Sequence, residues 1–558
     1  MGKIKISQNK TTSVSTIFFI IIIALSVFRI WLIKDRELVA ITPSPHDSLL
    51  YITNASSLIN NRWFGPYDER IISRGPIFPL LIAGAYLLHI PLGMANTIFY
   101  VLIASLFPFI AYKLLNNKWV IIPLYVLLLF NPFVIDHETS FEVVRSTFYP
   151  ALILGVALSI LGLLVTAEKS FKKALLFSVV SGCVFFLFWY YREEGFFILP
   201  LIGMSYAHSL WHAWKNKKIS RRYLIALIIP IIIFALLTQL LCLINLKYYG
   251  IYTTREFSHK SYSSAFAALL RIRPDSDNPL IPITKNQRMI LYQVSPSFAK
   301  LQPFFEGDGG KNWAGNSIVW TGIPSEEREI AGGAFYFAMR EAIWDITKPS
   351  QAKEQQFFEQ LTKEINLACS QHYVSCGTFP LSGFSLLNQS DRILFLNNFV
   401  NTVQTGVLAD KIDLSTVAKY SSGPEVQIDL FRKMTHGIIL TEGQQQPTPN
   451  PLTEKIYRLI SWWYRSVTPW IFFCTMIHYL YRIIRKSSLN FYDWYQASLV
   501  TSSLFFYFIV AIFGTLKSPT DTTAGSYTSG TYGLLLLFVV LEIMNRTTRQ
   551  NMRRDIVE

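Results

Sequence analysis

The chain has 558 residues, of which 51% are hydrophobic, 15% aromatic and 16% charged. Its hydrophobic residues gather in blocks of roughly 17–25 residues with almost no charge, whereas a soluble core helix of that length keeps a polar face. This composition excludes a disordered chain, a collagen-like chain and a small disulfide scaffold. The sequence therefore predicts an all-α polytopic membrane protein.

The formal net charge is +15, from 51 Lys and Arg against 36 Asp and Glu. Such an excess can indicate nucleic-acid binding, but no basic cluster lies beside a soluble domain with aromatic stacking positions. The basic residues instead gather in short segments between apolar blocks, for example at 169–173 and 546–554. This distribution is typical of cytoplasmic loops, and we expect no nucleic-acid partner.

Placing the basic clusters in the cytoplasm predicts ten crossings, which leave both termini in the cytoplasm and the chain in the plasma (inner) membrane. The crossings lie at about 14–33, 94–115, 118–135, 143–167, 174–191, 196–214, 223–246, 458–482, 493–515 and 529–546. An eleventh crossing at the apolar stretch 77–92 would move a basic cluster outside. We therefore expect a partial or re-entrant helix there.

These crossings divide the chain into three parts. Residues 1–246 form a module of seven spans with a first external loop at 34–76, residues 247–457 form a large, mostly helical extracytoplasmic region, and residues 458–558 hold the last three spans and a cytoplasmic tail. The apolar periodicity of 351–371 predicts an amphipathic helix. Cys369 and Cys376 lie close together at its end, and an oxidising compartment would allow a disulfide between them.

The first external loop places acidic residues just beyond a span. Asp47 begins an apolar run that is typical of a short helix on the membrane surface. Its side chain can cap that helix, or it can accept a proton from a hydroxyl that attacks a lipid-linked substrate. The loop then carries the pair Asp68 and Glu69, followed by Arg74 before the next apolar stretch.

A second outer segment is unusually rich in ionisable residues, namely Asp136, His137, Glu138, Glu142 and Arg145. Ionisable groups beside lipid usually pair with one another or mark a substrate path. Asp136, His137 and Glu138 are residue types that bind divalent cations, but three consecutive residues do not point to one side, so we assign no metal ligands. If a helix begins early, Glu138, Glu142 and Arg145 share one of its faces.

A third outer segment, 190–195, holds Arg192 and Glu193 at the end of a span. A snorkelling arginine within an aromatic belt explains this segment when it is considered alone. The three segments together favour a functional site, because a chain that only anchors a domain does not need carboxylates and arginines in each of them.

This layout resembles the GT-C superfamily of integral membrane glycosyltransferases, which includes the protein O-mannosyltransferases and the aminoarabinose transferases of lipid A. The resemblance lies in His46-Asp47 early in the first external loop, in the motif that begins at Arg74, in the acidic second loop, and in seven spans before a large external region. It covers residues 14–246, and the last three spans by topology only. It implies a GT-C-like bundle of about 10–11 helices.

The resemblance also implies a polyprenyl-phosphate sugar donor and a glycan, lipid or protein acceptor. It makes Asp47 the candidate general base, with Asp68 or Glu69 as the rival, because family members carry two adjacent acidic residues in the first-loop motif. Arg74, Arg145 and Arg192 would contact the lipid phosphate, since a guanidinium group donates two hydrogen bonds to it. Asp136, Glu138 and Glu142 would orient the acceptor or hold a divalent cation, which an inverting displacement does not require. The other residues expected to bind substrate are His46, His137 and Glu193.

Three other classes fit part of the pattern. A polysaccharide polymerase or ligase also combines many spans, a large external loop and arginine contacts to lipid phosphate. A flippase or transporter of lipid-linked sugars would use its carboxylates as ion relays, but the charges lie at span ends and no inverted repeat is visible. A receptor would need fewer spans. The prediction is therefore a membrane glycosyltransferase.

Overall fold

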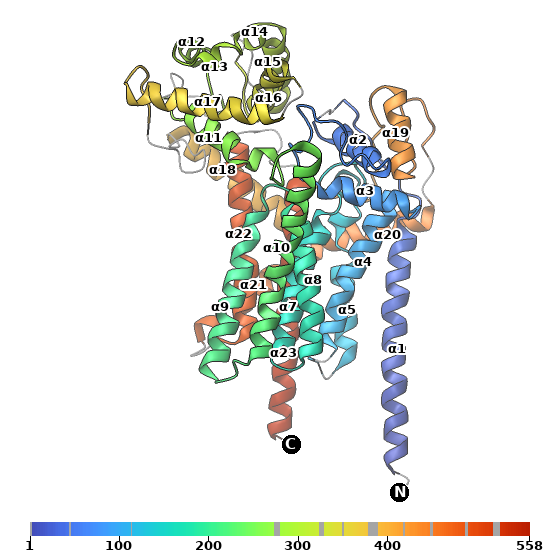
Figure 1. Cartoon of the computed structure of the whole chain (residues 1–558). Helices are drawn as coiled ribbons and strands as arrows, with labels where there is room; N and C mark the ends of the chain where they lie inside the picture. Colours follow the sequence, from blue (N-terminus) through green and yellow to red (C-terminus); the bar gives the residue numbers. More distant parts are fainter. Residues whose placement is uncertain are drawn as a thin grey trace.

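The computed structural model is a bundle of long helices that carries a group of shorter helices on one end (Figure 1). It describes residues 3–43, 46–112, 114–115, 117–272, 280–322, 329–348, 351–377, 389–416, 419–446, 450–485, 489–516 and 525–557. Within these ranges the β-structure consists of isolated bridges, such as the one between Val39 and Glu142. The predicted all-α class is confirmed.

Seven helices of the described chain are long and apolar enough to cross a membrane. They are α4 (Leu92–Ala111), α7 (Tyr149–Ala167), α8 (Phe171–Trp189), α10 (Arg221–Tyr249), α22 (Phe491–Leu516), α23 (Gly525–Val557) and the continuous helix of α20 (Pro451–Trp462), η6 (Trp463–Val467) and α21 (Thr468–Arg485). All seven coincide with predicted crossings. The chain is a multi-pass membrane protein.

At the three other predicted crossings the apolar part of the helix is shorter than in these seven. The apolar part of α1 (Lys3–Leu32) is Thr16–Leu32, and α9 (Leu199–Lys215) has 17 residues. Helix α5 (Ile121–Leu129) ends early, because Asn131 caps a new 3-10 turn that begins with a proline. Helix α3 (Ile77–Leu87) has 11 residues, too few to cross a bilayer, which agrees with the partial helix expected at 77–92.

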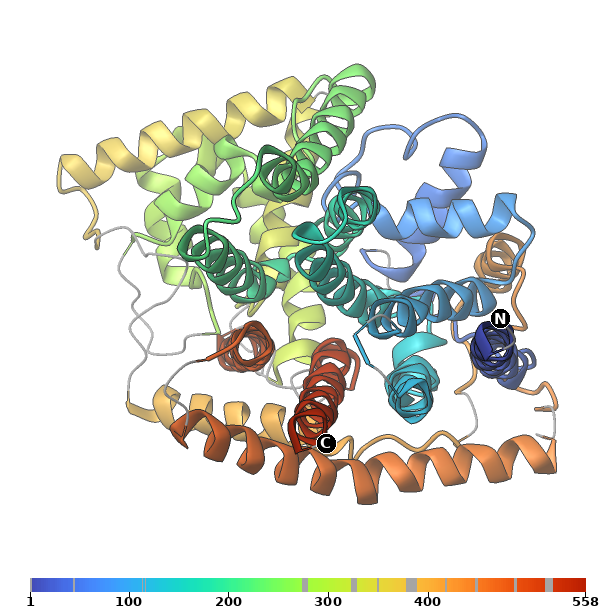
Figure 2. The ribbon, with the colours of Figure 1, turned by 90° about the horizontal axis from the view of Figure 1, so that it is seen from below.

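The continuous helix from α20 to α21 runs obliquely along one side of the bundle, across the lower edge of Figure 2. Its 35 residues extend over about 52 Å at 1.5 Å per residue, whereas the apolar layer of a bilayer is about 30 Å thick. A strongly tilted helix accommodates this difference. Its exposed side chains include Trp470, Phe473 and Ile477, which suit contact with lipid.

Helices α11 to α17 form a separate layer on one end of the bundle, which we call the head (residues 260–377). They are α11 (Lys260–Leu269), α12 (Lys285–Val294), α13 (Pro296–Ala299), α14 (Gln302–Phe305), α15 (Asp308–Thr321), α16 (Ala334–Thr347) and α17 (Gln351–Ser370). The head has its own hydrophobic core. Helix α17 confirms the amphipathic helix predicted at 351–371, because it buries Phe358, Leu361 and Ile365 in that core.

Both chain ends lie at the end of the bundle opposite the head, well apart from each other (Figure 1, Figure 2). Four further helices lie at or near the head end. They are α2 (Ser48–Ile59), α6 (His137–Ser140), α18 (Gln389–Leu408), which packs on α22, and α19 (Glu425–Thr435), which packs on α2 and α3. That the chain ends face the cytoplasm and the head faces the outside stays a prediction.

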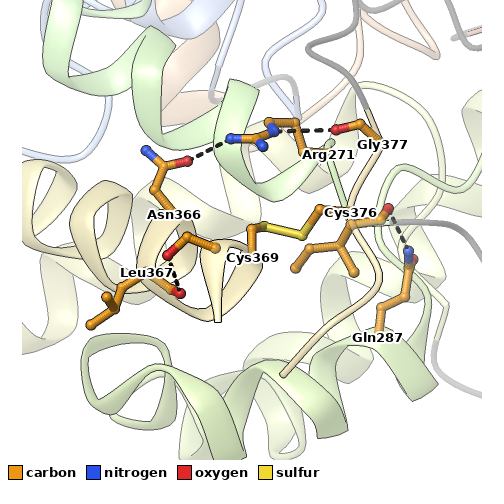
Figure 3. Close-up of a disulfide and its surroundings, with 9 residues drawn as sticks. Arg271, Gln287, Asn366, Leu367, Cys369, Cys376 and Gly377 are labelled. Carbon is orange, nitrogen blue, oxygen red and sulfur yellow. Dashed lines mark hydrogen bonds between the residues drawn. A yellow bond between two sulfur atoms is a disulfide. The ribbon is translucent and has the colours of Figure 1, made fainter. Parts of the chain in front are cut away.

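Cys369 and Cys376 form a disulfide at the C-terminal end of α17 (Figure 3). The pairing that the sequence allowed is therefore present. Arg271 lies beside it and donates to Asn366 Oδ1 at 2.8 Å and to the Gly377 carbonyl oxygen at 3.4 Å. Together these contacts attach the segment after α17 to the end of α11.

Removing this disulfide should destabilise the protein modestly. The chain entropy gained by opening so short a loop corresponds to about 2.5 kcal/mol. We expect Cys369→Ser to lower the thermal midpoint in detergent, and a reducing agent to bring the wild type to the same value. Cys474→Ser, at a free exposed cysteine, is the control. An unchanged midpoint in Cys369→Ser would show that the bond does not stabilise the head.

Candidate functional site

Charged side chains from four separate segments meet at the head end of the bundle. They are Asp47, Arg74, Arg145, Glu193 and Arg255, which we call the arginine cluster. Asp47 Oδ2 lies 3.3 Å from Arg74 Nη2, and Asp47 Oδ1 lies 3.5 Å from Arg145 Nε. Glu193 pairs with Arg145 and lies 4.0 Å from Arg74 and 3.9 Å from Arg255. Two carboxylates thus alternate with three guanidinium groups.

Gly75 explains how Arg74 reaches this cluster. A Cβ atom at position 75 would meet the Tyr190 carbonyl oxygen at 2.1 Å. Only glycine lets the loop lie directly against the turn that follows α8. That close approach places Arg74 beside Glu193, which belongs to the same turn.

Asp47 occupies the cap position of α2, but its side chain makes no hydrogen bond to the helix backbone. Besides the two arginines, the Tyr51 hydroxyl donates to Asp47 Oδ1 at 3.3 Å. The Asp47 side chain is 41% exposed. Helix capping is therefore not what this carboxylate does in the structure: it is held by three donors and remains open to a reacting hydroxyl.

The arginines also determine the charge of Glu193. Burial opposes its ionisation, but Arg145, Arg74 and Arg255 outweigh that effect and hold the pKa of Glu193 below its usual range. Glu193 is therefore a carboxylate at neutral pH. It fixes the positions of all three guanidinium groups.

Arg255 is a member of the cluster that the sequence analysis missed, because it stands alone in the segment after α10. Its Nε and Nη1 atoms are buried and have no hydrogen-bond partner among the described residues. A guanidinium group with unused donors is a good binding group for an anion such as phosphate. The only sequence signal for it was its position just beyond a span.

Arg192 and His46 lie at the edge of the cluster. Arg192 pairs with Glu194 and lies over the ring of Tyr149 at 4.7 Å. His46 contacts the rings of Trp313 and Phe337 in the head, with centroids 5.2 and 5.0 Å away. Burial, together with the nearby Arg70 and Arg74, lowers the pKa of His46 to about 4. His46 is therefore neutral at pH 7 and joins the first loop to the head.

Asp68 and Glu69, the rivals of Asp47, have local partners. Asp68 Oδ1 accepts hydrogen bonds from the backbone N–H groups of Arg70 and Ile71 at 2.8 and 2.9 Å. Glu69 pairs with Arg70 at 2.8 Å. Neither carboxylate pairs with the arginine cluster. The geometry therefore favours Asp47 as the candidate base.

The acidic residues of the second outer segment form a different group. Asp136 caps α6 and accepts from the Thr139 N–H at 3.0 Å, while Glu138 pairs with Lys419 at 2.6 Å. Burial raises the pKa of Asp136. Burial and the nearby Arg36 lower the pKa of His137 to about 3. These groups thus have partners of their own, apart from Asp47.

Helix α6 is only four residues long and ends at Ser140. The backbone then turns to bridge Val39 at Glu142. Glu138, Glu142 and Arg145 therefore share no helix face, and Arg145 alone of the three reaches Asp47. Among the residues that the structure describes, no group of three His, Cys, Asp or Glu side chains is placed to hold a metal ion.

Glu142 should make stability depend on pH. Burial, with Glu138 and Asp136 adding to it and Lys419 opposing it, raises the pKa of Glu142 to about 7. The folded protein then keeps a proton that the unfolded chain releases near pH 4.5, so this group costs stability as pH rises from 4.5 to 7. Glu142→Gln should therefore raise the thermal midpoint more at pH 8 than at pH 5. Glu359→Gln, on an exposed face of α17, is the control; equal shifts at both pH values would contradict the prediction.

A buried arginine of the head holds the first loop in place. Arg340 pairs with Glu256 and, at 3.7 Å, with Glu354, and it donates to the Tyr67 hydroxyl at 3.3 Å and to the Ile71 carbonyl oxygen at 3.0 Å. Burial, and then the neighbouring Glu256, raise the pKa of Glu354 to about 8. The loop that carries Arg74 is thus fixed to α16 and α17.

Ile72 lies in this loop with φ at +52°. A β-branched residue is strained in that region. The conformation persists because the Ile72 carbonyl accepts from the Glu256 N–H at 2.9 Å, next to the Arg340 contacts. The head therefore imposes the loop geometry that the arginine cluster needs.

No protein-family model matches the sequence, and no characterised protein matches it. Solved structures that align with the chain include two of the protein ArnT. ArnT from Cupriavidus metallidurans in the apo state aligns with a TM-score of 0.29 and 12% identity, over 94% of this chain and 78% of that chain. ArnT from the same organism bound to undecaprenyl phosphate aligns with a TM-score of 0.28 and 11% identity, over the same shares of the two chains. An alignment at this level assigns neither a reaction nor a site residue.

Proposed function

We propose that this chain is a GT-C-type membrane glycosyltransferase that moves a sugar from a polyprenyl-phosphate donor to an acceptor hydroxyl. The observation that carries the proposal is the pairing of Asp47 with Arg74 and Arg145, next to the unused buried donors of Arg255. A base and a phosphate-binding group then belong to one network. The acceptor is a glycan, a lipid or a protein.

The reaction is a single displacement with inversion. Asp47 accepts the proton of the acceptor hydroxyl while its oxygen attacks the anomeric carbon. The bond between that carbon and the phosphate oxygen breaks, and the polyprenyl phosphate leaves with the electron pair. Guanidinium groups stabilise the charge that develops on the leaving phosphate, so no general acid is required.

The members of the cluster divide these tasks. Arg74 and Arg145 orient Asp47, and Arg255 offers the phosphate its Nε donor, which has no hydrogen-bond partner among the described residues. Glu193 keeps the three arginines in place. The cluster carries one more positive than negative charge, which favours an anionic ligand.

A polysaccharide polymerase or ligase would use the same donor and the same cluster, and would differ in its acceptor. A flippase would carry its ionisable groups near the bilayer midplane. The arginine cluster lies at the head end of the bundle instead. Transfer at this end therefore agrees better with the geometry than transport does.

Binding of undecaprenyl phosphate to the purified protein tests the phosphate site. We expect Arg255→Gln to weaken binding about tenfold, because a charged donor pair is lost. Lys300→Gln, at an exposed lysine of the head, should leave the affinity unchanged. Equal affinity of the wild type and Arg255→Gln would remove Arg255 from the site, and no binding to the wild type would refute the proposed donor.

A further inference from the structure

A pocket lies between one face of α2 and the loop at 64–71, within the first loop that also carries Asp47 and Arg74. Its polar lining consists of Thr53, Asn54, Ser57, Asp68 and Arg70. Its apolar lining includes Phe64 and Ile71, which are buried at 3% and 4% exposure. A small hollow with an apolar base and several hydroxyl, amide and charged groups suits a ligand that is apolar on its ring faces and rich in hydroxyls.

Asn54 is the residue that most clearly lacks a partner. Its side chain is 6% exposed, and its Oδ1 atom has no hydrogen-bond partner among the described residues. A buried polar atom without a partner is destabilising. Asn54 lines the pocket, so its side-chain amide is placed to form a hydrogen bond with a ligand hydroxyl there.

Asp68 and Arg70 add charged groups at the opposite wall. The backbone N–H groups of Arg70 and Ile71 both donate to Asp68 Oδ1, which leaves Oδ2 for a ligand. Arg70 lies near enough to His46 to help lower the pKa of that ring.

Gly65 brings the loop close to α2. Its φ is +104°, which side chains rarely adopt, and a Cβ atom there would lie 3.0 Å from Ser57 Oγ. The tight approach of the loop to Ser57 closes one side of the pocket. Glycine at this position thus allows the loop to form a wall of the pocket, as Gly75 allows Arg74 to reach the arginine cluster.

The pocket is in line with the proposed base. Asp47, Leu50, Asn54 and Ser57 follow one another at the three- and four-residue spacing of one helix face. Asn54 lies two turns from Asp47, about 10 Å along the axis. All lining residues come from the first loop and none from the head. The pocket is thus part of the transmembrane module and not of the region expected to select the acceptor.

We propose that this pocket holds the sugar ring of the lipid-linked donor, with Asn54 hydrogen-bonded to a sugar hydroxyl. This inference rests on the proposed function, because the phosphate at Arg255 fixes the other end of the donor. The polar groups of the pocket then select the sugar: a site built to bond a hydroxyl rejects an analogue that lacks it.

Two binding measurements test this assignment. Affinities are determined for undecaprenyl phosphate and for a panel of undecaprenyl-phosphate-linked hexoses and pentoses, with the wild type and Asn54→Leu. We expect at least one sugar-bearing lipid to bind the wild type more tightly than undecaprenyl phosphate, and Asn54→Leu to lose roughly tenfold of that affinity. The affinity of undecaprenyl phosphate itself should not change.

Ser56→Ala, on α2 but outside the pocket lining, is the matched control and should behave as the wild type. Ser57→Ala serves as the second test if Asn54→Leu fails to fold. Equal binding of sugar-bearing lipids to the wild type and the pocket variants would overturn the inference. A loss of sugar transfer in the pocket variants with unchanged donor binding would also overturn it, because that result places the pocket on the acceptor side. Absence of undecaprenyl phosphate binding to the wild type would instead refute the proposed function.

Discussion

Asp47→Asn should lower the rate of sugar transfer roughly a hundredfold to ten-thousandfold, the range found when a general base is lost. The asparagine amide has the size of the carboxylate but cannot accept the proton of the acceptor hydroxyl. Donor binding should fall only a few-fold, because the phosphate is bound by arginine donors. Initial rates with a labelled lipid donor, together with its dissociation constant, separate the two effects.

Glu69→Gln is the control for this experiment, since Glu69 pairs with Arg70 outside the arginine cluster. It should keep the wild-type rate within a few-fold. A wild-type rate in Asp47→Asn, or a larger loss in Glu69→Gln, would move the base from Asp47 to the pair at 68–69.

Arg340→Met should destabilise the protein by about 3–5 kcal/mol, because it leaves the buried Glu256 carboxylate, next to the mostly protonated Glu354, without its positive partner. Both carboxylates are fully buried in the structure. The loop at 67–72 would lose the donors that fix it to the head, so the arginine cluster should also lose its geometry. We expect a lower thermal midpoint in detergent and a loss of undecaprenyl phosphate binding.

Two comparisons show whether the buried charge is the cause. Arg432→Met removes an arginine of exposed ion pairs on α19, where the loss should stay below about 1 kcal/mol. Adding Glu256→Gln and Glu354→Gln to Arg340→Met should restore much of the stability, because no unpaired charge then remains buried. If Arg432→Met and Arg340→Met were equally stable, the Arg340 network would not be the link between loop and head.

The membrane-spanning part of the fold could be predicted from the sequence because length and hydropathy act within one helix. The same reasoning overestimated the helix after Lys118, since Asn131 starts a new turn inside the apolar block. It correctly predicted a partial helix, and not a crossing, at 77–92. The head helix at 351–371 and the disulfide beside it were also predictable, from local periodicity and spacing.

The candidate site was predictable in part. Asp47, Arg74, Arg145 and Glu193 were each suggested by their place at a span end, and the structure brings them together. Arg255 was missed, because nothing in its own segment marks it. The network around Arg340 was missed because its partners come from three distant segments of the chain.

The residues of the second outer segment separate in the structure. Its many acidic residues led to the prediction of site residues across 136–145, but only Arg145 lies in the arginine cluster. The short helix α6 and the bridge between Val39 and Glu142 lead the acidic residues to other partners. Sequence density alone does not tell which way a loop turns after a four-residue helix.

Release of undecaprenyl phosphate from a radiolabelled panel of undecaprenyl-phosphate sugars tests the central claim most directly. The purified protein in lipid is incubated with each donor and with candidate glycan, lipid and protein acceptors, with and without a chelator, beside Asp47→Asn. We predict release that requires an acceptor, persists in the chelator and disappears in Asp47→Asn. No release from any donor, with undecaprenyl phosphate still bound, would contradict the glycosyltransferase assignment and favour the transport of an intact lipid-linked sugar.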